Sequence, residues 1–293
     1  MAALALGLVA AAPPPPYRFP NARILYQPIF VRASSARALT PTSQIPLLSL
    51  FGWTLGGVFI AEWRESPIGP YREVAVLSGL VARGVSIGAW ASDILVTTPQ
   101  AVESAREEFG LPARLGAVDF IESAVPSSPH SPSALEQAGE TAVSIGRDLA
   151  LLLKTLAGTA IPGVAEPAER LALPPTSPAP ITLEFEADDT AVVRGWTGTT
   201  EAPSSADGNG IVLPSFSGCL PLEDGSETPL LRYPLTIGSV RHLRFRQPLQ
   251  SSVALGASEE LRAVLTGPRA SPCIEADGTL IVAGQPTEVS SRK

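Results

Sequence analysis

Residues 55–96, LGGVFIAEWRESPIGPYREVAVLSGLVARGVSIGAWASDILV, contain three apolar runs that decide the fold class of this chain. The runs cover residues 55–64, 73–82 and 86–96, and each is rich in Val, Ile, Leu and aromatic residues. Gly and Pro residues interrupt the sequence around them. Short apolar runs with such breaks are typical of strands and turns. The stretch therefore predicts a mainly β fold.

The rest of the chain continues this pattern and adds two helices. Further candidate strands cover residues 24–32, 181–186, 191–195 and 240–246. One helix is expected after Thr98, which can cap its first turn, with Pro99 at the first helical position and Gly110 as its stop. A second apolar run, residues 141–156, predicts another helix. The predicted class is mainly β (α+β), with a few flanking helices.

The domain organisation follows from composition along the chain. The chain has 293 residues, of which 45% are hydrophobic and 17% charged, so it can bury a large core without disulfides. Residues 1–16 are apolar and Pro-rich and are expected to form a flexible tail. Loose insertions rich in Pro, Ser or Gly are expected near 125–139, 160–180 and 199–210. None is long or polar enough to separate domains, so we predict one domain over residues 17–285 and a tail over 286–293.

Composition also disfavours several classes of partner. The net charge is −7 and Lys and Arg form no block, whereas a nucleic-acid binder needs a basic face. Residues 38–61 carry no charge, but their Pro and Gly residues favour buried strands over a membrane span. The only histidines, His130 and His242, support neither a catalytic triad nor a metal site. No Gly-rich turn between a strand and a helix suggests a nucleotide, so we expect no cofactor.

Four ordered motifs resemble the acetoacetate decarboxylase superfamily. They are SPIGPYRE at 66–73, REEFGLP at 106–112, ARLG at 113–116 and GWTG at 195–198. Within this superfamily the chain is most similar to the plant neoxanthin-deficient proteins. That similarity rests on ILYQ at 24–27, FGWTLGG at 51–57, DILVT at 93–97 and LPSFSG at 213–218, and it extends over residues 17–250. The resemblance implies a large antiparallel sheet closed into an acetoacetate decarboxylase-like barrel.

The resemblance also identifies what this chain lacks. In the decarboxylases, the position of Ala113 holds the lysine that condenses with the substrate, and a second lysine follows it and lowers its pKa. This chain has Ala113 and Arg114, and arginine cannot be deprotonated to act as the nucleophile. The only lysines are Lys154 and Lys293, neither within forty residues of Ala113. We therefore expect no decarboxylation through an imine, and the loss favours a protein that is not an enzyme.

Several other residues are candidates for the pocket by resemblance. Glu73 matches an active-site carboxylate, which can act as an acid or base or hold a hydroxyl. The alternative is an ion pair of Glu73 with Arg72 or Arg114 at the mouth of the pocket. Arg23 lies one place from the family's pocket arginine, and two tryptophans have core packing as their alternative. The candidates are Glu73, Arg114, Arg23, Trp90 and Trp196, with no metal ligands.

The resemblance implies a protein required for neoxanthin formation, upstream of abscisic acid, as an accessory or ligand-binding protein rather than the synthase. Its expected partners are an apolar small molecule, such as a carotenoid, or a protein of the carotenoid pathway. One alternative is an enzyme that uses Glu73 and Arg114 for acid–base chemistry, and another is a structural interaction module. Carotenoid involvement implies the plastid, but residues 1–16 lack transit-peptide features, so the cytoplasm stays open.

Overall fold

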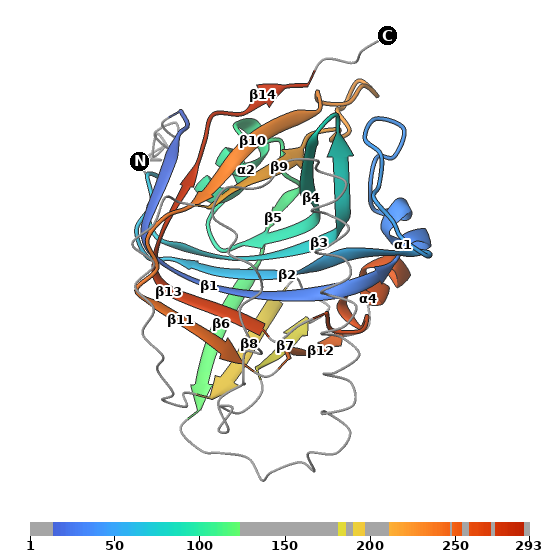
Figure 1. Cartoon of the computed structure of the whole chain (residues 1–293). Helices are drawn as coiled ribbons and strands as arrows, with labels where there is room; N and C mark the ends of the chain where they lie inside the picture. Colours follow the sequence, from blue (N-terminus) through green and yellow to red (C-terminus); the bar gives the residue numbers. More distant parts are fainter. Residues whose placement is uncertain are drawn as a thin grey trace, which may run out of the picture.

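Strands dominate the structure, and most of them wrap into a barrel with a smaller sheet packed against its outside (Figure 1). This computed structural model describes residues 14–123, 181–185, 190–196, 211–246, 248–253, 258–270 and 273–289. The tail at 1–13, the loose insertions near 125–139, 160–180 and 199–210, and the helix at 141–156 lie outside the described residues.

Seven strands form the closed barrel: β1 (Tyr17–Arg32), β2 (Trp53–Trp63), β3 (Tyr71–Arg83), β4 (Ser86–Val96), β9 (Ile211–Ser217), β10 (Leu231–Ile237) and β13 (Cys273–Ala283). Their order is β13-β1-β2-β3-β4-β9-β10, and β10 pairs with β13 to close the ring. The predicted barrel is confirmed. It is mixed rather than wholly antiparallel, because the long connection after β4 returns β9 parallel to it.

Three short strands extend the barrel sheet. β5 (Ala113–Leu115) pairs with β4 in parallel, and β11 (His242–Arg246) pairs with β13. β14 (Thr287–Glu288) pairs with β10, so two residues of the expected C-terminal tail belong to this sheet.

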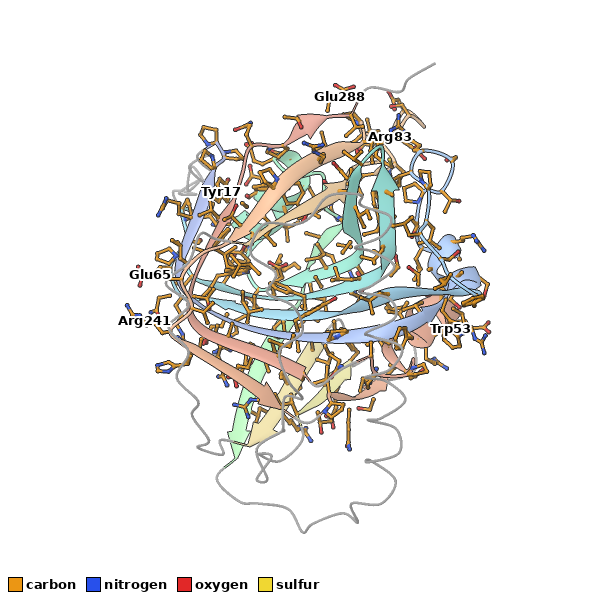
Figure 2. The ribbon with its side chains drawn as sticks, in the orientation of Figure 1. Tyr17, Trp53, Glu65, Arg83, Arg241 and Glu288 are labelled. Carbon is orange, nitrogen blue, oxygen red and sulfur yellow. The ribbon has the colours of Figure 1, made fainter. Side chains whose placement is uncertain are left out.

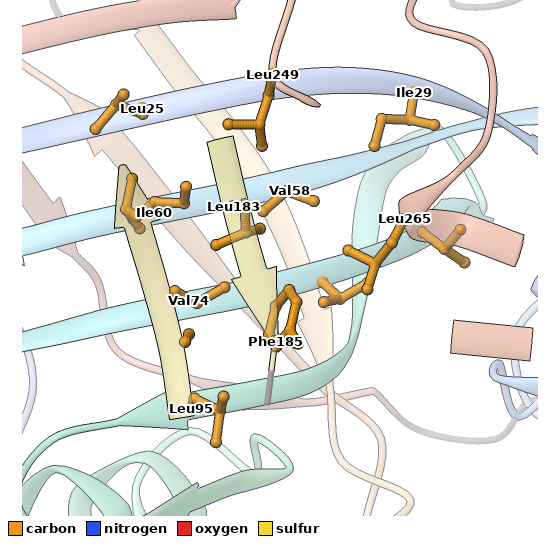
Figure 3. Packing of buried hydrophobic residues seen from close by; sticks show 14 of the residues in the cluster. Leu25, Ile29, Val58, Ile60, Val74, Leu95, Leu183, Phe185, Leu249 and Leu265 are labelled. Atoms are coloured by element: carbon orange, nitrogen blue, oxygen red, sulfur yellow. The ribbon is translucent and has the colours of Figure 1, made fainter. Parts of the chain in front are cut away.

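A second, four-stranded sheet covers part of the outer surface of the barrel. It consists of β12 (Gln250–Val253), β7 (Thr182–Phe185), β8 (Thr190–Trp196) and β6 (Ala117–Ser123), in that order. Figure 3 shows the apolar cluster between the two layers, to which the barrel contributes Leu25, Val58, Ile60, Val74 and Leu95 and the second sheet Leu183 and Phe185. Burial of these side chains holds the second sheet in place.

Among the described residues, three helices accompany the sheets: α1 (Ala33–Ala38), α2 (Pro99–Glu107) and α4 (Glu259–Leu265). The prediction for α2 is confirmed, since the Thr98 side chain accepts a hydrogen bond from Ala101 N and Pro99 opens the helix. Gly110 follows with a φ of 60°, which suits glycine at a helix end. In the described part of the chain, no helix is both long and apolar enough to cross a membrane.

Side-chain alternation gives each barrel strand an inner and an outer face. Tyr17 of β1, Trp63 of β2, Tyr233 of β10 and Ile281 of β13 belong to one buried cluster, although their strands lie around the ring. This shared cluster identifies their face as the inner one. The intervening residues, such as Ile60 next to Ala61, face the second sheet instead.

Candidate functional site

Glu73 is a carboxyl group inside the barrel. Its strand β3 pairs with β2 at Ala61 and with β4 at Val96, so the side chain lies on the inner face together with Tyr71 and Ala75. Trp63, also on the inner face, donates a hydrogen bond from Nε1 to Glu73 Oε2 at 2.9 Å. This hydrogen bond occupies one of the two carboxyl oxygens.

The surroundings of Glu73 favour its neutral form. Burial raises its pKa from 4.5 to about 7, and the hydrogen bond from Trp63 offsets only part of this rise. The side chain is nonetheless only half-buried. The carboxyl group is therefore desolvated by the side chains packed around it but keeps some accessible surface. Near neutral pH this group can either donate or accept a proton.

Aromatic side chains surround this carboxyl group. Burial and the nearby charge of Glu73 both raise the pKa values of Tyr71 and Tyr233, so the two phenols remain protonated donors. The ring of Trp63 lies 6.1 Å from that of Tyr71, and the ring of Phe109 lies 5.2 Å from that of Tyr233, measured between centroids. The polar groups near Glu73, the indole of Trp63 and the phenols of Tyr71 and Tyr233, are thus neutral and lie among apolar side chains.

Ala113 faces the same interior as Glu73. The register joins Ala75 of β3 to Ile94 of β4, and Ile94 to Ala113 of β5, so all three side chains share one face. Glu73 precedes Ala75 by two residues and lies on that face as well. Ala113 is fully buried, and Arg106 Nε donates to its carbonyl oxygen at 2.7 Å. The position at which the resemblance predicts a nucleophilic lysine therefore lies inside and presents only a methyl group.

Arg114 lies outside the interior that contains Glu73, whereas our sequence analysis expected it in the pocket. It pairs in register with Leu95, whose side chain packs toward the second sheet, so it lies on the outer face. Its Nε and Nη2 atoms donate to the two carboxylate oxygens of Asp93 at 2.8 and 2.9 Å. Alternation corrects the prediction, because consecutive residues of a strand point to opposite faces. Ala113 and Arg114 cannot both point inward.

The other predicted arginines also lie outside the barrel. Arg23 Nε donates to Glu275 Oε1 at 2.9 Å, and the neighbouring Ile24 takes the inner face. Arg72 lies 3.5 Å from Glu62 and 3.6 Å from Asp119. The expected alternative, an ion pair of Glu73 with an arginine, is thus replaced by the hydrogen bond from Trp63.

The two candidate tryptophans differ in what can be said of them. Trp90 is buried in a separate apolar cluster with Val81 and Phe216, so it packs in the core away from Glu73. Trp196 ends β8, and its side chain lies outside the described residues. In the portion of the chain that is described, no group of His, Cys, Asp and Glu could hold a metal ion.

The structure adds Trp63, Tyr71 and Tyr233 to the site. Tyr71 is two residues from Glu73, and Trp63 is two residues from Ala61, which also faces inward. The alternation of inward and outward residues along a strand could therefore have identified both from the sequence. Tyr233 lies 160 residues further along the chain than Glu73, and only the closure of the barrel brings its strand to this place. No sequence pattern that we used could identify it.

The arrangement of strands is also found in known structures. The acetoacetate decarboxylase of Legionella pneumophila superposes with a TM-score of 0.53 over 95% of this chain and 88% of that chain, at 13% identity. The fold is that of the acetoacetate decarboxylases. The predicted superfamily resemblance is therefore confirmed at the level of the fold.

Plant proteins are among the curated relatives of this chain. Protein NEOXANTHIN-DEFICIENT 1 of Oryza sativa subsp. japonica is 40% identical over 101 residues, which are 34% of this chain and 33% of the relative. The Arabidopsis thaliana protein of the same name is 38% identical over 112 residues, 38% of this chain and 39% of the relative. The matches thus span between a third and two fifths of these relatives. No model of a known protein family matches the chain.

Proposed function

We propose that this chain takes part in neoxanthin formation, upstream of abscisic acid, as an accessory or ligand-binding protein that does not decarboxylate. The plant relatives support the pathway through their name, NEOXANTHIN-DEFICIENT 1. The position of Ala113 supports the loss of decarboxylation. Imine chemistry requires a primary amine beside the substrate, and the side chain at this inward position is a methyl group.

The interior supports a neutral, largely apolar ligand that carries an oxygen atom. Its polar groups around Glu73 are Trp63, Tyr71 and Tyr233, which are uncharged donors. Arg23 and Arg114 lie on the outer face with acidic partners, where they do not attract an anion into the barrel. An anionic ligand beside Glu73 would bear the cost of a second buried negative charge. A carotenoid with hydroxyl or epoxide groups has the required chemistry.

The pathway assignment is tested by complementation. An Arabidopsis thaliana line without its NEOXANTHIN-DEFICIENT 1 protein should regain neoxanthin when it expresses this chain. Expression of a Glu73→Ala variant should restore less neoxanthin at equal protein level, because the carboxyl group is lost from the interior. Unchanged pigments with the intact chain would contradict the pathway, and would leave the structural interaction module as the better hypothesis.

The absence of decarboxylation has its own test. The purified protein, incubated with acetoacetate, should release no carbon dioxide above the buffer rate. Borohydride should trap no adduct detectable by mass spectrometry. An adduct on Lys154, which lies outside the described residues, would show that another amine reaches the substrate and would overturn this part of the proposal.

An enzyme based on Glu73 is the second candidate. Burial places the pKa of this carboxyl at about 7, which suits a general acid or base near neutral pH. Arg114 lies on the outer face, so Tyr71 is the better candidate for a second donor. Conversion of violaxanthin to neoxanthin by the purified protein, lost on Glu73→Gln, would favour this enzyme over the accessory role.

A further inference from the structure

The turn that precedes β2 carries an unusual residue. Leu50 and Trp53 close it through two backbone hydrogen bonds, N to O in both directions, of 2.8 and 2.9 Å. Its two central residues, Phe51 and Gly52, have φ angles of 50° and 81°. Two positive φ angles define a type I′ turn, whose preferred sequence is Asn-Gly because bulky residues are strained at the first position. We call residues 50–53 the aromatic turn.

Phe51 is unfavourable in the isolated protein on two separate grounds. Its backbone adopts the left-handed region, which a bulky side chain rarely occupies. Its side chain is 92% exposed, so it gains no burial within the chain in return. Strain of this kind persists where a function requires it, and the observed outlier is a reason to look for one.

The surroundings of Phe51 are rigid, aromatic and basic. Ala33 N donates to Gly52 O at 2.9 Å, which fixes the turn to the start of α1. The guanidinium of Arg32 lies 3.8 Å from the ring centroid of Trp53, and Figure 2 shows Trp53 at the edge of the molecule. Arg32, at the N-cap of α1, and Arg37, in its last turn, are exposed. Their positive charge contrasts with the net charge of −7 for the whole chain.

We propose that the aromatic turn docks this protein on the surface of an anionic lipid bilayer, with Phe51 inserted among the acyl chains. Aromatic rings and arginines with apolar stems favour the interface between water and lipid. Arginines close to the surface add attraction to anionic headgroups. A protein partner fits less well, because a stable interface buries about 1,200 Å² or more and this turn offers Phe51 and the edge of Leu50.

The acidic residues nearby limit the electrostatic attraction of this region to anionic lipid. α4 packs beside α1 and begins with Glu259 and Glu260, while Arg262 on the same helix carries the opposite charge. The positive charges of Arg32 and Arg37 are therefore partly offset by these carboxylates. We expect the insertion of Phe51 to contribute more to binding than the lipid charge does.

Co-sedimentation of the full chain with vesicles tests this proposal. Vesicles of phosphatidylcholine with about one third phosphatidylglycerol should retain the protein, and pure phosphatidylcholine should retain several-fold less. Phe51→Asn should reduce binding roughly tenfold, because it removes the buried ring. The same change creates the preferred Asn-Gly turn, so its melting temperature should equal or exceed that of the wild type. Loss of binding then cannot reflect misfolding.

Val85→Ser is the matched control. Val85 is 93% exposed and lies in the turn between β3 and β4, so it is an apolar tip of similar exposure elsewhere on the molecule. This variant should bind vesicles as the wild type does. The proposal is overturned if the wild type fails to bind either vesicle, if Phe51→Asn binds equally well, or if Val85→Ser loses as much binding.

Discussion

At the scale of single residues, the face of the strand decides what each candidate can do. Ala113 and Arg114 are neighbours in the sequence, yet one lies inside the barrel and the other pairs with Asp93 outside it. Glu73 lies inside, and its partner is the indole of Trp63 rather than a cation. The interior therefore contains a carboxyl group whose pKa burial raises to about 7, and a methyl group at Ala113.

The raised pKa of Glu73 predicts a pH-dependent loss of stability. The pKa is about 7 in the folded chain and 4.5 as its ordinary value, so the folded state holds the proton more tightly. Stability contributed by this group is fully present below about pH 4.5 and falls as the pH rises to about 7. Glu73→Gln should therefore gain up to about 3 kcal/mol relative to the wild type between pH 4.5 and 8.

Urea unfolding at the two pH values measures this difference. Glu103→Gln, at an exposed position of α2, is the control and should follow the wild type. A Glu73→Gln variant that shows no relative gain above pH 7 would mean that the carboxyl is solvated in the folded protein.

Restoring an amine at two adjacent positions tests the assignment of faces. Ala113→Lys should place a primary amine in the interior, where burial lowers its pKa and leaves it nucleophilic. Acetoacetate with borohydride should then give an adduct on residue 113, detected by peptide mass spectrometry. Arg114→Lys places its amine on the outer face and should give far less adduct. Equal adducts at both positions would contradict the inward placement of Ala113.

At the scale of elements, a buried ionic network joins three strands on the outside of the barrel. Glu275 of β13 is fully buried and accepts hydrogen bonds from Arg23 of β1 and Arg246 of β11. Arg246 is only 3% exposed. β6 also approaches this region, because the ring of Phe120 lies within 6 Å of both Arg23 and Arg72. The arginine expected in the pocket thus holds strands together instead.

Removal of the central carboxylate should be strongly destabilising. Glu275→Ala leaves Arg246 buried without this acidic partner, which costs about 3–5 kcal/mol for a buried ion pair. Glu62→Ala, which removes a partly exposed carboxylate from the same outer face, should cost about 1 kcal/mol or less. Chemical denaturation of both variants gives the two values. Similar small losses would indicate that water solvates the Glu275 site.

At the scale of the whole molecule, closure of the barrel surrounds Glu73 with side chains from strands that are far apart in the sequence. β10 and β13 meet through the pairs Leu235–Ala283, Thr236–Val282 and Ile237–Ile281. This junction brings Tyr233 across the interior toward a carboxyl group on β3. The second sheet stabilises the barrel from outside through a separate apolar cluster. The two layers therefore have different tasks, since one encloses the site and the other supports the wall.

A cavity at the closing junction should weaken the whole barrel. Ile281 is 1% exposed on the inner face of β13, so Ile281→Ala should lower the free energy of unfolding by about 2–5 kcal/mol. Ile121→Ala, at a position 45% exposed on β6, should cost about 0.5 kcal/mol or less. Amide exchange in β10 should accelerate in the first variant alone. Unchanged exchange there would show that the β10–β13 pairing does not depend on this side chain.

Much of the local structure was predictable. The central strands and the capped helix α2 follow from short apolar runs and from Thr98, Pro99 and Gly110, because these signals act over a few residues. β13 was missed, since its sequence CIEADGTLIVA contains acidic residues and a glycine that suggest a loop. Those residues become strand through the ladders with β1 and β11, and Glu275 forms an ion pair with Arg23 and Asp277 with Arg64.

The sequence by itself determined the β class, the resemblance to the decarboxylases and the presence of alanine at position 113. Only the tertiary structure decided that Arg23 and Arg114 face outward, that Trp63 holds Glu73 and that Tyr233 joins them. The physical reason is that alternation fixes which residues of a strand share a face, whereas closure of the ring determines which face becomes the inside.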